Sequence, residues 1–268
     1  MPGPLFPAPN KRLGQHFLID QNIVRKIIAA AELASDDTVL EIGPGRGILT
    51  EALSHAARRV VTIEIDPELC VVLRARQSEW ANVELICADA LAYPFETLPS
   101  SVVVANLPYY ISTPLIFKFL EHRQRFRRVV LMLQNEVVDR LAAAAGDPEY
   151  GVLSVMAQYA AEVRKLFKVS ANCFRPRPEV GSAVVILHPR PEAMLSPQAE
   201  PHFRAVVKAA FAHRRKTLIN SLRDEGCEAV VATAAVAGMQ LRPTVRAETL
   251  TIEQFIELAR RLECWHLS

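Results

Sequence analysis

The fold of this chain is decided by the stretch Val39-Leu40-Glu41-Ile42-Gly43-Pro44-Gly45-Arg46-Gly47. Its first four residues complete a short apolar run typical of a buried strand, and a helical pattern begins directly after it. Glycines at alternate positions let the backbone turn tightly and approach a ligand without a Cβ in the way. A strand, a glycine turn and a helix in this order indicate a site for a nucleotide-like ligand; the alternative is a tight turn that binds nothing.

The same alternation of strand and helix continues on both sides of this stretch. A helix is expected from about Gln21, with Asp20 as its N-cap, and further helices over Ile48–Ala57 and Pro67–Gln77. Strands that alternate with helices at this spacing predict parallel βαβ units, and so an α/β fold with a doubly wound, Rossmann-like sheet. The expected strands are Thr38–Ile42, Val60–Ile65, Val83–Cys87, Val102–Ala105, Val129–Leu133, Val163–Val169 and Ala183–Leu187.

A proline-rich stretch divides the chain. Four prolines lie between His188 and Pro201, which is typical of a linker, and the pattern beyond them is helical. We expect a disordered lead-in over 1–12, a first domain over 13–190, a linker over 191–201 and a small all-helical domain over 202–268. The helices expected there are His202–Phe211, Arg215–Leu222, Glu228–Ala237 and a last one capped by Thr251 and Gln254.

The distribution of charged residues along the chain is more informative about a binding partner than the net charge. The 268 residues carry a net charge of only +2, yet basic residues without any acid fill two stretches, Arg164–Arg177 and Phe203–Arg223, and a third cluster lies at Arg123–Arg128. One basic cluster is ordinarily a solvated face, but three in a chain of balanced charge favour a polyanionic partner. No apolar run approaches the roughly 20 residues that cross a bilayer.

The cysteines and the N-terminal residues indicate the cellular compartment in which we expect the protein. Five scattered cysteines with no Cys-x-x-Cys spacing favour a reducing compartment and argue against a disulfide framework and a structural zinc site. Residues 1–9 lack the basic segment and apolar core of a secretory signal. We therefore expect a cytoplasmic protein without a membrane span or a bound metal.

The glycine turn favours S-adenosylmethionine over NAD. The dinucleotide fingerprint G-x-G-x-x-G opens a helix whose N-terminus holds a pyrophosphate, and Ile48 stands here at the position of its third glycine. The acidic Glu41 before the first glycine suits a sulfonium or amino group better than phosphates.

Acidic residues end the next two strands. Glu64 ends the second strand, where a carboxylate meets ribose hydroxyls in such folds, and Asp89 follows the third strand, where it can accept from an adenine amino group. Asp66 competes with Glu64, but Asp66-Pro67 has the pattern of a helix cap and first turn. Each acid taken singly is more often a helix cap than a ligand-binding residue. Acids at successive strand ends seldom arise by chance, so together they indicate a ligand site.

Asn106-Leu107-Pro108-Tyr109 follows the strand expected over 102–105. The Asn106 carbonyl can accept one hydrogen of a planar amino group, and the carbonyl of Leu107 or Pro108 can accept the other. Tyr109 can lie against the ring that carries the amine. The alternative is a surface turn in which proline ends the strand and tyrosine packs on the core.

Several motifs together resemble one family. They are Gln15–Leu18, Glu41–Gly47, Asn106–Pro114, Gln134–Arg140 and Phe174–Ser182, which are similar to those of the rRNA adenine N6,N6-dimethyltransferases. Tyr150–Gln158 and Arg214–Leu222 resemble the bacterial small-subunit enzymes in particular, and the resemblance runs from about Lys11 to Leu262. Two positions depart from the family: His16 stands where Asn is common, and Tyr110 replaces the Asn that commonly follows the Asn-Leu-Pro-Tyr motif.

The resemblance implies an activity and a set of site residues. It implies a class I methyltransferase that uses S-adenosylmethionine to dimethylate N6 of two adjacent adenosines near the 3′ end of 16S rRNA. Nothing in the sequence suggests an obligate protein partner, so we expect a monomer. Asn106 and a neighbouring carbonyl would hold the amine, while Tyr109 and Phe174 would clamp the base. The implied cofactor residues are His16, Leu18, Gly43, Gly45, Glu64, Asp89 and Asn106, and the expected RNA contacts are Arg175, Arg177, Arg214, Arg215 and Lys216.

Three alternatives remain open at this point. The chain could be a large-subunit rRNA adenine methyltransferase of the antibiotic-resistance type, which shares the Asn-x-Pro-Tyr signature. It could act mainly as a ribosome-assembly factor without catalysis, which the intact Asn106, Tyr109, Glu64 and Asp89 disfavour. An NAD-dependent oxidoreductase is disfavoured by Ile48 and by the lack of a Tyr-x-x-x-Lys proton donor.

Overall fold

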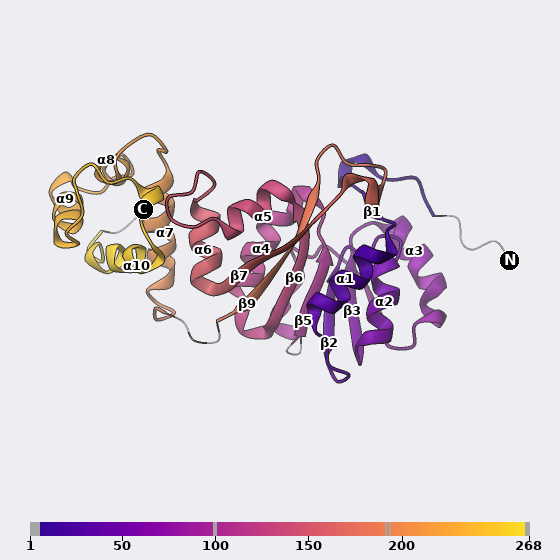
Figure 1. Cartoon of the computed structure of the whole chain (residues 1–268). Coiled ribbons are helices and arrows are strands. Elements are labelled where there is room, and N and C mark those ends of the chain that lie inside the picture. The colour runs from indigo at the N-terminus through magenta and orange to yellow at the C-terminus, as the bar shows by residue number, and fades with distance from the viewer. Residues whose placement is uncertain (1–5, 99–100, 191, 193, 266–268) are drawn as a thin grey trace. The chain divides into compact units, whose positions relative to one another are not determined.

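The computed structural model describes residues 6–98, 101–190, 192 and 194–265 (Figure 1). The chain divides into two compact units, one built from residues 1–138 and 161–191 and the other from 139–160 and 192–268. The second unit therefore includes a segment that the sequence assigns to the first domain. Of the expected lead-in, 1–5 lie outside the described residues, and the rest ends in the short 3-10 turn η1 (Lys11–Leu13).

A seven-stranded sheet forms the centre of the first unit, with the order β4-β3-β2-β5-β6-β9-β7. The pairs from β4 to β6 are parallel, whereas β9 is antiparallel to both β6 and β7, so the sheet is mixed at one side. The expected doubly wound, Rossmann-like arrangement is confirmed. The strands are β2 (Thr38–Ile42), β3 (Arg59–Glu64), β4 (Val83–Cys87), β5 (Ser101–Asn106), β6 (Phe126–Gln134), β7 (Ala161–Val169) and β9 (Ser182–Pro189).

Apolar runs explain why the inner strands lie where they do. Residues 102–105 of β5 and 129–133 of β6 are buried on both faces, as parallel strands covered by helices are. Helix α1 (Gln21–Ala31) begins where expected because the Asp20 side chain accepts from two backbone N–H groups. The other helices that start in this unit are α2 (Ile48–Ala56), α3 (Pro67–Arg76), α4 (Ser112–Glu121) and α5 (Asn135–Ala142), with 3-10 turns η2 (Gln77–Glu79), η3 (Phe95–Thr97), η4 (Tyr109–Ile111) and η5 (Arg123–Arg125).

A second, two-stranded sheet joins distant parts of the chain. β1 (Phe17–Leu18) pairs antiparallel with β8 (Phe174–Arg175), which follows the 3-10 turn η6 (Ala171–Cys173). Two of the motifs quoted above, one N-terminal and one late in the chain, are thus held side by side. Strands of two residues are too short to be read from periodicity.

The second unit is helical. It contains α6 (Val152–Ala160), α7 (Glu200–Phe211), α8 (Leu218–Asp224), α9 (Ala229–Gly238), η7 (Ala247–Thr249) and α10 (Ile252–Arg261). The expected capping box of Thr251 and Gln254 is present. Two side-chain contacts explain why 139–160 belongs here. The ring centroids of Tyr159 and Phe203 lie 4.6 Å apart, and the Tyr150 hydroxyl donates a hydrogen bond to the Leu250 carbonyl at 2.9 Å.

The helix expected over Arg215–Leu222 begins later than predicted. Arg214, Arg215 and Lys216 lie in the turn between α7 and α8, because Thr217 acts as the N-cap of α8 and accepts from the Asn220 N–H. The basic residues are therefore on an exposed turn and not on a helix face. Among the described residues, no helix is long and apolar enough to span a membrane.

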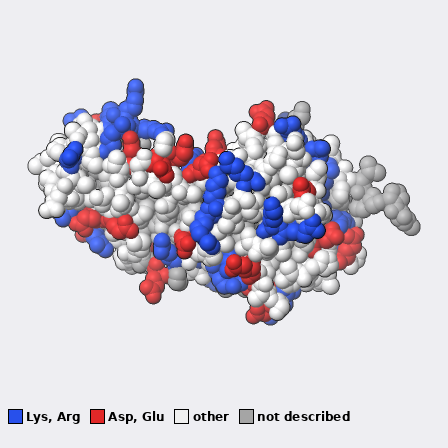
Figure 2. Space-filling model, in the orientation of Figure 1, with Lys and Arg blue, Asp and Glu red and all other residues white. Residues whose placement is uncertain are grey.

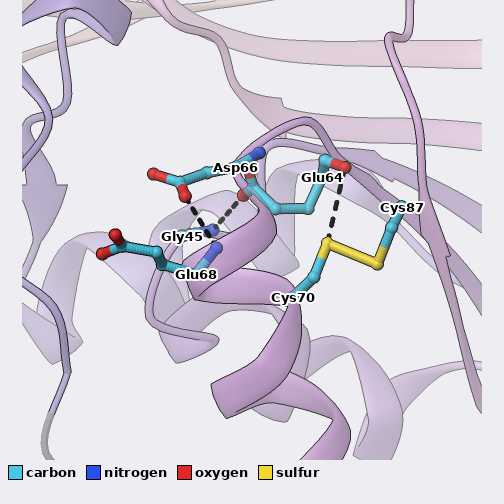
Figure 3. Close-up of a disulfide and its surroundings, with 6 residues drawn as sticks. All are labelled: Gly45, Glu64, Asp66, Glu68, Cys70 and Cys87. Carbon is cyan, nitrogen blue, oxygen red and sulfur yellow. Dashed lines mark hydrogen bonds between the residues drawn. A yellow bond between two sulfur atoms is a disulfide. The ribbon is translucent and has the colours of Figure 1, made fainter.

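One disulfide is present, between Cys70 of α3 and Cys87 at the end of β4 (Figure 3). The sequence argued against a disulfide framework and did not anticipate this single pair, so the argument for a reducing compartment loses support. Neither the count nor the spacing of 17 residues announces the pair, which forms because α3 packs on β4. Cys173, Cys227 and Cys264 are free thiols.

The disulfide closes a loop and should stabilise the oxidised protein. A cross-link over about 15 residues contributes ~3 kcal/mol through the unfolded chain. We expect a Cys70→Ser/Cys87→Ser variant to lose about this much free energy of unfolding in urea, and wild-type protein to lose it on reduction. Cys264→Ser is the matched control. Equal stability of the wild type with and without reductant would contradict the cross-link.

Burial of Glu41 predicts a pH dependence of stability. This β2 side chain is 1% exposed and accepts from the Thr50 hydroxyl at 2.7 Å. Burial raises the pKa of Glu41 from 4.5 to about 8. Between these values the unfolded state loses the proton and the folded state keeps it, so stability falls as pH rises, by up to ~1.4 kcal/mol per pH unit.

The Glu41→Gln variant removes this titration. Its free energy of unfolding should stay flatter between pH 4.5 and about 8 than that of the wild type, in chemical unfolding at a series of pH values. Glu51→Gln, on the exposed side of α2, is the control and should leave the wild-type slope unchanged. Parallel curves for wild type and Glu41→Gln would show that Glu41 is ionised in the fold.

Candidate active site

A cavity lies at the carboxyl ends of β2, β3 and β5. The strand order reverses here, because β3 lies on one side of β2 and β5 on the other, and such switch points are where open α/β sheets bind ligands. Its lining comes from the N-terminal segment 13–18, the glycine turn, the start of α2, the end of β3, residues 106–110 and Phe174.

The glycine turn is shaped by its contacts. Gly45 has a φ of 58°, and its N–H donates to Oε2 of Glu64 at 3.2 Å. A Cβ at this position would lie 3.0 Å from the Phe17 ring, so a larger residue would displace the N-terminal segment. Gly43, with a φ of 68°, lies against Pro108. The turn therefore brings together the ends of β2, β3 and β5.

Glu64 is held as an acceptor at the end of β3 (Figure 3). It is 5% exposed, and its second oxygen accepts the Asp66 N–H at 2.9 Å. Burial raises the pKa of Glu64, and the hydrogen bonds from the two backbone N–H groups offset part of that rise. Asp66 caps α3, as the sequence predicts, and also accepts from Gln15 at 2.6 Å. Glu64, whose carboxylate lines the cavity, remains the candidate for ribose hydroxyls.

Asp89 is placed differently from the other expected cofactor residues. It follows β4, is exposed, and accepts from the Leu91 N–H at 2.8 Å. It does not line the cavity. Its backbone neighbour Ala88 donates to the Glu64 carbonyl, so Asp89 lies beyond Glu64 at the rim.

Asn106 ends β5 and lines the cavity. Its side chain makes no hydrogen bond to any other residue that the structure describes. Beside it, Leu107 is buried, and its N–H donates to the Met132 carbonyl at 3.2 Å, which fixes the start of the turn. The amide of Asn106 is therefore available to a ligand.

The backbone distinguishes the two carbonyls that the sequence leaves open. The Pro108 carbonyl accepts the Ile111 N–H at 3.2 Å in the 3-10 turn η4. The Leu107 carbonyl accepts no backbone hydrogen bond from the described part of the chain, and it follows Asn106 directly. The better second acceptor for an amino group is therefore Leu107.

Tyr109 is fixed by two partners. Its hydroxyl lies 3.0 Å from Oγ of Ser182, which is fully buried on β9. Its ring stacks at 5.8 Å on His16, whose Nδ1 lies 2.8 Å from the Pro176 carbonyl. Burial raises the pKa of Tyr109, so the phenol stays neutral. His16 thus contacts Tyr109 as well as the cavity.

Phe174 lies deeper than a base clamp requires. It is 1% exposed, belongs to the hydrophobic core and pairs with Leu18 in the β1–β8 sheet, although both residues line the cavity. This placement is that of an ordinary core residue. Stacking on a base would require its ring to move.

Two other lining residues, Gln15 and Ile65, were given no role by the sequence reasoning. Gln15 joins the N-terminal segment to Asp66, and Ile65 leaves an apolar side chain 44% exposed beside Glu64. Tyr110 is 48% exposed at the rim. Burial raises its pKa, as do the charges of Asp89 and Glu64, so it lies on the side of the cavity that carries the acids. The sequence signal that could have identified Ile65 is its position as an apolar residue directly after Glu64.

The expected RNA-contacting residues are exposed. Arg175 ends β8, the strand whose Phe174 lines the cavity, and Arg177 follows two residues later, after the strand has ended. In the helical unit, Lys216 is ion-paired with Asp224 and lowers the pKa of that carboxyl, and Arg214 donates to the Pro148 carbonyl. Arg215 has no partner among the described residues.

Known proteins resemble this chain over nearly its whole length. The family "Ribosomal RNA adenine dimethylase" matches residues 8–263. "Ribosomal RNA small subunit methyltransferase A" of Moorella thermoacetica is 43% identical over 268 residues, covering 96% of this chain and 93% of that protein. The protein of the same name from Ligilactobacillus salivarius is 41% identical and covers 94% and 89%.

Solved structures agree with these matches. A dimethyladenosine transferase from Plasmodium falciparum superposes with a TM-score of 0.80 at 29% identity, covering 93% of this chain and 98% of that one. The 23S rRNA methyltransferase ErmE gives a TM-score of 0.73, also at 29% identity, covering 92% and 99%. The oxidoreductase alternative is thereby excluded, and the chain belongs to the ribosomal RNA adenine dimethylase family.

Proposed function

We propose that this protein transfers methyl groups from S-adenosylmethionine to N6 of two adjacent adenosines near the 3′ end of 16S rRNA, during assembly of the small ribosomal subunit. The observation that carries the chemistry is the free amide of Asn106 in the cavity, next to an available carbonyl and an aromatic ring. The substrate assignment is supported by relatives at 41–43% identity that are named as small-subunit methyltransferases.

The residues of the cavity fit S-adenosylmethionine. Glu64 offers a carboxylate for ribose hydroxyls, Ile65 an apolar face for an adenine, and the glycine turn a backbone that a ligand can approach closely. His16, Leu18, Gly43 and Gly45 border the same space, and Asp89 would act from its rim. When bound there, the sulfonium supplies an electrophilic methyl group.

The chain's contribution is to orient the amine. An exocyclic adenine nitrogen is a weak nucleophile because its lone pair is delocalised into the ring. Asn106 Oδ1 and the Leu107 carbonyl would accept its two hydrogens, favour a pyramidal nitrogen and direct the lone pair at the methyl group. No general base is required, since the methylated nitrogen is acidic and its proton leaves afterwards.

Tyr109 would hold the plane of the base. The target must be flipped out or unpaired to reach the cavity, and base–aromatic stacking contributes ~1–3 kcal/mol per base. The Ser182 bond and the His16 ring fix the orientation of Tyr109 before the base arrives. Phe174 would form the second face only after moving out of the core.

The remaining assignments rest on the same substrate. Arg175 and Arg177 beside the cavity, and Arg214, Arg215 and Lys216 in the helical unit, would contact phosphates. A protein that modifies ribosomal RNA in bacteria acts in the cytoplasm, and we propose a monomer with no obligate protein partner.

The Asn106→Ala variant tests the proposed role directly. It should lower kcat for methylation of unmodified small subunits by at least about 100-fold, as loss of one preorganised hydrogen-bonding group does at other sites. Binding of S-adenosylmethionine, measured by calorimetry, should stay mostly intact. Asn172→Ala, on the exposed surface, is the control. Full methylation activity of Asn106→Ala would contradict the assignment of Asn106 as the residue that holds the target amine.

Reversal of Arg214, Arg215 and Lys216 to Glu should weaken binding to small subunits and flatten its salt dependence, because each lost phosphate contact lowers the slope by about 0.9. Since Lys216 is paired with Asp224, Arg215→Glu alone should cause more of the change than Lys216→Glu. Filter binding across a salt series measures both. An unchanged slope for the triple variant would place the contact surface elsewhere.

A further inference from the structure

Six exposed cations lie on three elements of the first unit, or directly after one of them. We define the basic track as Arg25, Lys26, Arg164, Lys168, Arg175 and Arg177. Two of them lie on α1, two on β7, and two on β8 and just after it. Figure 2 shows Lys and Arg side chains gathered in the middle of the face on which α1 and β7 lie.

A side-chain contact joins α1 to β7. Nζ of Lys26 lies 5.6 Å from the centroid of the Phe167 ring, so the outward side of α1 adjoins β7. Phe167 is itself packed against the hydrophobic core, which fixes this contact. The cations on the helix and those on the strand therefore form one surface.

Most charges of the track are not neutralised by an acidic residue of the described protein. Five of the six cations form no ion pair with any residue that the structure describes, and Arg164 has Glu162 at 3.7 Å. Elsewhere in the same unit arginines are paired: Arg59 with Glu84, Arg76 with Glu51 and Glu79, Arg127 with Asp37, and Arg128 with Glu32. The track thus leaves its charges available to an external anion.

The track leads to the candidate active site. From Arg164 to Val169 is about 17 Å at the rise of an extended strand. Val169 pairs with Ser182, whose hydroxyl lies 3.0 Å from that of Tyr109. Beyond β7 the chain reaches Arg175 and Arg177, on either side of the Pro176 carbonyl that His16 contacts. One end of the track is therefore at the cavity.

We propose that the basic track binds the backbone of the single-stranded RNA segment that leads to the target adenosine. A narrow line of cations that ends at an aromatic site matches how proteins follow a single strand. This inference rests on the proposed function and adds to it the route of the substrate. Protection of a sheet edge explains the cations of β7, since β7 is an edge strand, but not those of α1 or Arg177.

The Lys26→Glu/Lys168→Glu variant tests the track. Its affinity for unmethylated small-subunit rRNA should fall, and the slope of log affinity against log salt should decrease by about 1.4–1.8, at 0.7–0.9 per phosphate contact. The control is Arg58→Glu/Arg74→Glu, an equal charge change on two exposed arginines that lie towards the opposite edge of the sheet, by β3 and α3. The control should keep the wild-type slope, and both variants should keep wild-type affinity for S-adenosylmethionine.

The other possible results distinguish a failure of the basic-track proposal from a failure of the proposed function. If wild-type protein methylates the small-subunit rRNA while Lys26→Glu/Lys168→Glu binds it with an unchanged slope, the track is wrong and the proposed function stands. A wild type that methylates no small-subunit rRNA overturns the function itself. Lys26→Gln/Lys168→Gln, which adds no acid, repeats the test if the first variant unfolds. Preferential binding of the wild type to anionic vesicles over RNA, lost in the same variant, would also overturn the RNA assignment.

Discussion

The N–H of Gly45 donates to the buried carboxylate of Glu64, and this contact joins the turn after β2 to the end of β3. A carboxylate in that position must be satisfied, and it is, by Gly45 on one oxygen and Asp66 on the other. The arrangement exists because β2 and β3 are parallel neighbours whose carboxyl ends meet at one edge. The shape of the cofactor side of the cavity depends on it.

The substrate side depends on a different set of contacts. The β1–β8 pairing holds the N-terminal segment against residues 174–176, and His16 and Ser182 then fix Tyr109 from two directions. Asn106 is left with a free amide beside it. The acceptors for an amine and the platform for a ring are therefore held in place by segments from the N-terminus, β5, β8 and β9, so that the site needs little rearrangement of Tyr109 or Asn106.

Much of this fold could be predicted from local sequence. The apolar runs place each of the seven strands of the main sheet to within a few residues, and side-chain caps such as Asp20, Asp66 and Thr251 begin helices where expected. These features succeed because periodicity and capping are properties of a few neighbouring residues. The glycine turn and Asn106 belong to the same class, since each follows directly from a strand.

Features that depend on tertiary packing escaped prediction. The Cys70–Cys87 pair needs the packing of α3 on β4, and the grouping of 139–160 with the second unit depends on partners such as Phe203. Burial of Phe174 follows from the β1–β8 pairing, which two-residue strands do not announce. For Arg214–Lys216, the hydroxyl of Thr217 competes with helical continuation, so the basic residues lie in a turn.

The most direct measurement of the central claim maps where the methyl groups go. Ribosomal subunits that lack adenine dimethylation would be incubated with the protein and S-adenosylmethionine labelled in its methyl group, and the labelled nucleotides located in both rRNAs. We expect dimethylated adenine at two adjacent positions near the 3′ end of the small-subunit rRNA, in wild-type reactions and not with Asn106→Ala. Label in the large-subunit rRNA, or no label in either, would contradict the account.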